Sequence, residues 1–180
     1  MDSLAAITND PGALATVLSI GFGIALGAFG YVWNGIQEKK RYTFDVLMRY
    51  TENTDVLMAL HRAWTHVARH KSYDQSRIDA DTERSLEILL AYFQSIAVAV
   101  KYHMLNHEIV LVARYGSMRS LWDFYRPYIE AKRLQLGRPL LYADLEDFLR
   151  RNAARYERYA KRQHARLLRS GPLPPHPAQG

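Results

Sequence analysis

The sequence predicts an all-α protein in which a single N-terminal transmembrane helix precedes a cytoplasmic helical bundle. The stretch from Ala13 to Trp33 contains no charged residue, and about twenty apolar residues in a helix span the roughly 30 Å core of a bilayer. After it, apolar residues recur at helical spacing, without the alternating pattern of a half-buried strand. We expect four segments: a short extracytoplasmic N-terminus (1–12), a transmembrane helix (13–36), a cytoplasmic helical domain (37–170) and a disordered proline-rich tail (171–180).

Charge is distributed unevenly along the chain. The net charge is +6, and all 24 Lys and Arg residues lie at or after Lys39. The basic run Lys39–Arg41 places that end of the apolar stretch in the cytoplasm, with the N-terminus outside. The acidic Asp2 and Asp10 argue against a cleaved signal peptide. The absence of cysteine excludes a disulfide framework, a thiolate nucleophile and a Cys-ligated metal.

The first helix is predicted to begin at Asp10–Gly12, where a capping carboxylate precedes Pro11 in the first turn. It is expected to continue into the cytoplasm, because residues 37–50 contain no Gly or Pro. Within the predicted span, small residues recur about one turn apart, a spacing that lets another membrane helix approach closely. They are Ser19, Gly23, Gly27 and Gly30. The alternative is that glycine is simply frequent in membrane helices.

A second helix is expected over about residues 55–70, after a break where Asn53 or Thr54 can form the cap. Its predicted buried face carries Leu57, Leu60, Trp64 and Ala68. His66 and His70 fall on the opposite face, which we expect to point toward water. Residues 71–79 are polar and predict a loop.

The strongest helix pattern begins near residues 79–81 and runs to about residue 103. Its broad apolar stripe predicts the centre of the core. A short helix over 108–115, capped by Asn106, is expected to stop at Gly116, and a further helix begins at Ser117 and is kinked by Pro127. The last helix is predicted from about Tyr142 to Leu168. The stripe of the strongest helix consists of Leu86, Leu89, Leu90, Phe93, Ile96, Ala97 and Val100.

Residues 89–151 resemble the bacterial family called domain of unknown function 4760. The resemblance implies a helical fold, a membrane tether in a bacterial inner (cytoplasmic) membrane, and no particular activity. The sequence departs from the family pattern at Gln94, where an acidic residue is usual. The matching segments are Arg41–Leu47, Tyr92–Gln94, His107–Glu108, Trp122–Ile129, Arg133 and Tyr142–Phe148.

An arginine stripe is the clearest candidate contact surface. Its six members are spaced by three or four residues, so they lie within about 80° around the last helix. Such a face suits anionic lipid headgroups, an acidic protein or phosphates, and the alternative is a solvated helix face. We expect membrane lipid as a partner and do not expect nucleic acid. The stripe consists of Arg151, Arg155, Arg158, Arg162, Arg166 and Arg169.

Two weaker patterns point toward enzymes. The pairs His66/His70 and His103/His107 have i, i+4 spacing and form a weak candidate for a metal site. Arg158 and His164 resemble the loose Arg-to-His spacing of the HEPN ribonucleases, but six residues place them on different sides of a helix.

The sequence therefore predicts a single-pass interaction, accessory or scaffold protein without catalysis and without a cofactor. We expect it to form a homo-oligomer or to join a membrane-protein complex. The alternatives are an oligomeric membrane effector, such as a pore or defence-type protein, and a HEPN-like nuclease or His-metal enzyme.

Overall fold

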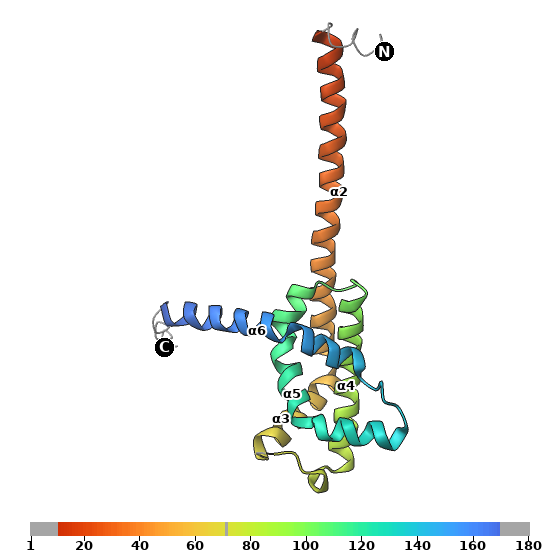
Figure 1. Ribbon diagram of the computed structural model, residues 1–180, viewed down its shortest axis with the longest axis vertical. Coiled ribbons are helices and arrows are strands. Elements are labelled where there is room, and N and C mark those ends of the chain that lie inside the picture. The colour runs from red at the N-terminus through yellow and green to blue at the C-terminus, as the bar shows by residue number, and fades with distance from the viewer. Residues whose placement is uncertain (1–10, 71, 170–180) are drawn as a thin grey trace, which may run out of the picture. The chain divides into compact units, whose positions relative to one another are not determined.

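The computed structural model describes the backbone of residues 11–70 and 72–169 (Figure 1). Over these residues the chain is helical and contains no strand, so the predicted all-α class is confirmed. The helices are α2 (Pro11–Glu52), α3 (Thr54–Arg69), the 3₁₀ helix η1 (Gln75–Arg77), α4 (Ala80–Lys101), α5 (His107–Leu136) and α6 (Ala143–Arg169). Residues 1–10 of the predicted N-terminal segment and the whole predicted tail lie outside the described residues.

The chain divides into two units, Met1–Tyr42 and Thr43–Gly180. Within the predicted span 13–36, the side chains of residues 13–18, 20, 21 and 23 are outside the described set. Over the residues that are described, none of the helices combines sufficient length with sufficient apolar character to cross a bilayer. These residues therefore do not support the predicted transmembrane helix.

The second unit is built around α4, which contacts α3, α5 and α6. Every member of the apolar stripe predicted for this helix is buried, so the predicted centre of the core is confirmed. The helix begins where Asp79 Oδ1 accepts a hydrogen bond of 2.7 Å from the backbone N–H of Thr82. Each fully buried aliphatic or aromatic side chain of this kind contributes about 1.5–3 kcal/mol to folding.

Helix α3 begins as predicted, but its predicted buried face was wrong. Asn53 Oδ1 caps the helix by accepting from the backbone N–H groups of Asp55 and Val56. The buried residues are Val56, Ala59, Ala63 and His66, whereas Leu57, Trp64 and Ala68 are exposed. Of the predicted face, Leu60 alone packs against the core, and it is only partly buried. The short alanine side chains allow a close contact between α3 and α4, and this packing outweighs the burial of the larger residues.

Helix α5 also differs from the prediction, because it runs without a break through Gly116 and Ser117. A Cβ atom added to Gly116 would lie 2.6 Å from the hydroxyl oxygen of Tyr156 on α6. Gly116 is therefore a position of close approach between two helices rather than a helix stop. The helix contains Pro127 and changes direction along its length (Figure 1). It ends at Gly137, which has the positive φ of 60° that glycine tolerates best.

Candidate functional site: the arginine stripe of α6

Helix α6 has an inner segment, residues 143–152, that packs into the second unit. Leu145, Phe148, Leu149 and Asn152 are buried, and the Tyr115 hydroxyl donates a 2.8 Å hydrogen bond to the backbone carbonyl of Leu149. The buried contacts fix this segment firmly against α4 and α5.

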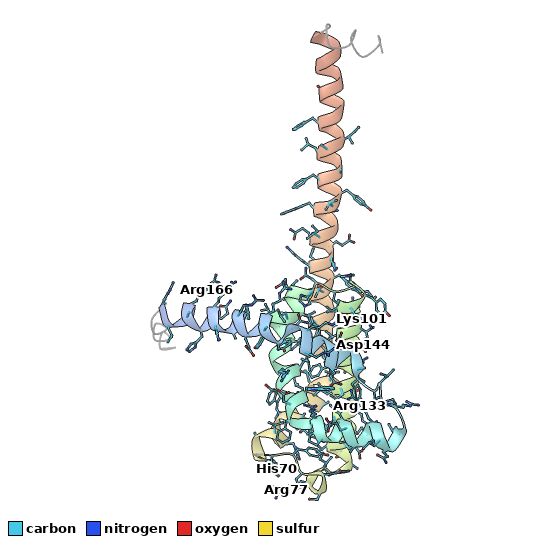
Figure 2. All side chains as sticks on the ribbon, viewed as in Figure 1. His70, Arg77, Lys101, Arg133, Asp144 and Arg166 are labelled. Atoms are coloured by element: carbon cyan, nitrogen blue, oxygen red, sulfur yellow. The ribbon has the colours of Figure 1, made fainter. Side chains whose placement is uncertain are left out.

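Polar contacts fix the start of the inner segment. Gln94 accepts a hydrogen bond of 2.9 Å from the backbone N–H of Leu145 and donates one of 3.0 Å to Asp144. Lys101 Nζ lies 2.7 Å from the other oxygen of Asp144, and Figure 2 shows these two side chains next to each other. Arg133 on α5 donates to Glu146 at 2.8 Å. Charged and amide groups from two helices therefore hold the N-terminal turn of α6.

The outer segment of α6, residues 153–169, has no buried residue among those described. Figure 1 shows it continuing beyond the other helices of its unit. It contains six basic residues and one acidic residue, Glu157. Near its start Tyr156 packs against Tyr115 and Arg155 pairs with Glu108. The described residues beyond them are exposed or only partly buried.

The structure places all six members of the arginine stripe on the exposed surface. The two nearest the core have carboxylate partners: Arg151 Nε lies 2.8 Å from Asp147, and Arg155 pairs with Glu108. Hydrogen bonds from Arg150 and Arg151 hold the pKa of the Asp147 carboxyl below its usual range. Figure 2 labels Arg166 toward the far end of the helix.

Arg158 and Arg162 differ from the two inner arginines. Arg158 Nε donates to the backbone carbonyl of Ala154 at 3.3 Å, within the same helix. No described carboxylate lies within ion-pair distance of either guanidinium. Their positive charge therefore remains available to an anion.

The small-residue face of α2 is described only in part. Ser19 is exposed, and the side-chain surroundings of Gly23 lie outside the described set. A Cβ atom added to Gly27 or Gly30 would meet no described atom within 4 Å. Within a single chain, no described atom packs against these two glycines.

His66 is buried, contrary to the prediction that it faces water. The Tyr125 hydroxyl donates to the backbone carbonyl of Ala63, so His66 Nδ1 donates to Tyr125 at 3.0 Å. Nε2 of His66 is buried without a described partner. Burial, followed by the nearby charge of His70, lowers the pKa of His66. The sequence signal for this burial was the placement of Ala63 and Ala59 about one and two turns earlier on the same helix face.

The histidine pairs do not converge on one site. His70 lies 3.2 Å from Arg77, and Figure 2 shows these residues at the end of the unit away from Lys101. His103 is exposed just after Lys101, and His107 Nε2 donates to Asn152 at 2.7 Å. Over the described residues, no group of three or more His, Asp, Glu or Cys is placed to hold a metal ion.

Arg158 and His164 are both exposed on the outer segment. No hydrogen bond or ring contact joins them in the described part of α6. This geometry gives the HEPN-like interpretation no additional support.

A shallow cleft of about 350 Å³ between α4, α5 and α6 was not predicted. It combines basic and acidic side chains, and its described lining contains no Ser or Cys nucleophile. The sequence could not indicate it, because the residues that α6 contributes come more than 40 positions after those of α4. Its charged lining is formed by Lys101, His103, His107, Asp144, Asp147 and Arg151.

Together these features define a helical protein with a basic helix extending from a packed unit. The chain belongs to the family described as Domain of unknown function (DUF4760), which it matches over residues 15–152. No curated protein and no solved structure matches the chain. The family match ends at Asn152, which is also the last buried residue described in α6.

Proposed function

We propose that this protein is a membrane-anchored interaction or scaffold protein that binds an anionic partner and has no catalytic activity. The observation that carries the proposal is the exposure of six arginines along one face of α6. Only one acidic residue, Glu157, accompanies the basic residues of the outer segment. A cationic face of this kind attracts anionic surfaces and binds them in a salt-dependent way.

The membrane anchor in this proposal rests on the sequence. The uncharged residues 13–33 have the length of a bilayer span, and the basic run Lys39–Arg41 favours a cytoplasmic position for the helical domain after it. We further propose that the chain assembles with itself through Gly27 and Gly30, because small residues permit close contact between membrane helices.

Membrane association is tested by flotation of the full chain with neutral liposomes after an alkaline wash. A chain that floats supports the anchor, and a chain that stays in the soluble fraction refutes it. Loss of ions from cells that overproduce the protein would instead favour a pore-forming effector.

Assembly is tested by native mass spectrometry of the detergent-extracted protein. Gly27→Leu with Gly30→Leu is expected to reduce the oligomer to a monomer. Gly35→Leu is the matched control, because Gly35 has equally open surroundings but lies on another side of the helix. A monomeric wild-type protein, or equal effects of both variants, would refute assembly through this face.

A further inference from the structure

The outer segment of α6 lies beyond both the core and the family match. The family match and the buried part of the helix end together at Asn152. The following residues, 153–169, carry six basic groups and one acidic group, a net charge of 6 − 1 = +5. This segment therefore adds a strongly cationic helix that lies outside the family match and contacts the core through Tyr156.

Four of the six cationic groups of this segment form one narrow row. Arg158, Arg162, Arg166 and Arg169 follow each other at intervals of four, four and three residues. At 1.5 Å per residue the row extends over about 16 Å, within about 80° of the helix circumference. A row of this width can touch a flat anionic surface along its whole length.

We propose that the outer segment binds the headgroups of anionic phospholipids, through Arg158, Arg162, Arg166 and Arg169. The proposal rests on the proposed function, because the membrane anchor would keep the segment at a high effective concentration near the lipid. Each basic residue close to an anionic membrane strengthens binding about fivefold.

Nucleic acid is the competing partner for a row of arginines. Sequence-specific binding needs side chains that read base edges beside the phosphate contacts. The only amide side chain of the outer segment, Gln163, lies about 100° from the row and is partly buried. Arginine can contact phosphate groups and also the guanine edge, so the chemistry of the row fits both partners, and the proposed membrane anchor is what favours a lipid surface.

A site-specific label on the full chain tests the proposal. The protein has no cysteine, so Ala165→Cys provides a single labelling position beside the row. Ala160→Cys is the matched control on the opposite side of the same segment, and both alanines are exposed. The labelled chain is reconstituted into neutral phosphatidylcholine nanodiscs and into discs that also contain phosphatidylglycerol, each with a headgroup quencher. We expect quenching at position 165 in the anionic discs, weak quenching at position 160, and loss of the effect at high salt.

Two charge-matched variants identify the residues responsible. Arg158→Gln, Arg162→Gln and Arg169→Gln together should abolish the quenching, and glutamine keeps a helix propensity close to that of arginine. The control replaces three exposed arginines elsewhere, Arg69, Arg84 and Arg138, with glutamine and should leave the quenching unchanged. Equal quenching in neutral and anionic discs, or equal loss in both variants, overturns the proposal. Binding to a short RNA duplex that needs the same three arginines, without any effect of lipid charge, would replace lipid by nucleic acid.

The failure of the anchor is distinguishable from the failure of this inference. If the full chain does not float with neutral liposomes, the anchor is refuted and flotation with anionic liposomes is measured instead. Binding to anionic liposomes that is about a hundredfold weaker for the variant with Arg158→Gln, Arg162→Gln and Arg169→Gln than for the control variant supports the inference. Equal binding of the two variants overturns it.

Discussion

Replacing Gly116 by alanine would set two opposing effects against each other at one position. Gly116 lies in the interior of α5, where alanine is favoured over glycine by about 1 kcal/mol. The added Cβ atom, however, would lie 2.6 Å from the hydroxyl oxygen of Tyr156 and 3.4 Å from its Cζ atom. The first distance is too short for two non-bonded heavy atoms, so Tyr156 must move by about 0.8 Å.

The cost of that movement decides the sign of the effect. The Tyr156 ring packs against Tyr115, with 4.6 Å between the ring centroids, so it cannot shift without disturbing this contact. Overpacking costs about 1–3 kcal/mol, and an aromatic pair contributes about 0.5–1.5 kcal/mol. We therefore expect Gly116→Ala to lower the free energy of unfolding by about 1 kcal/mol, despite its better helix propensity.

A double-mutant cycle isolates this clash. Tyr156→Phe removes only the hydroxyl oxygen, after which the nearest ring atom lies at an ordinary contact distance. In that background Gly116→Ala should raise the free energy of unfolding by about 1 kcal/mol, which gives a coupling of about 2 kcal/mol. The four proteins are compared by urea unfolding, followed by circular dichroism under one solvent condition. A Gly116→Ala substitution that stabilises both backgrounds equally would refute the close contact between α5 and α6.

Two further predictions concern buried and partly buried polar groups. Burial holds the pKa of His66 below 6.5, so the unfolded chain binds this proton at a higher pH than the folded chain does. The contribution of neutral His66 to the free energy of unfolding is therefore fully present above pH 6.5 and is lost as the pH drops through the folded pKa. When urea unfolding midpoints are measured across pH, His66→Asn should reduce their decrease at low pH. His61→Asn, at an exposed position of the same helix, should leave that decrease unchanged. The same pH dependence in both variants would refute the role of His66. Gln94→Glu should lower the free energy of unfolding by about 1–2 kcal/mol in the same assay, because a carboxylate would replace the amide that donates to Asp144. Adding Asp144→Asn should recover most of this loss. A Gln94→Glu variant as stable as the wild type would count against this contact.

The parts of the fold that the sequence predicts well are those that depend on local pattern. The apolar stripe of α4 repeats large residues at helical spacing, and all of them are buried. Asn106 is predicted as a cap and Asn53 as one of two candidates beside Thr54, and each asparagine side chain accepts from two backbone N–H groups. The exposure of the arginine stripe follows equally directly from its composition, because a charged face cannot be buried without partners.

The errors arise where a small residue permits a contact with a distant part of the chain. Ala59 and Ala63 place α3 close to α4, and the same rotation buries His66 and exposes Trp64. α5 continues through Gly116, and the absence of a side chain there leaves room for Tyr156, which comes 40 residues later in the chain. Helical spacing locates a face, but it does not reveal which of two candidate faces a neighbouring helix can approach more closely.

The contacts of α6 explain why its two segments can serve different purposes. The inner segment is held by groups that belong to the family-matched region, among them Gln94 and Arg133. The Gln94 amide suits this position because it can accept from Leu145 and donate to Asp144 at once. A carboxylate could accept from the backbone but would repel Asp144. The inner segment thus fixes the start of a helix whose outer half touches the core through Tyr156 but has no buried residue among those described. Substitutions in the outer arginines should therefore change what the protein binds and leave its fold intact.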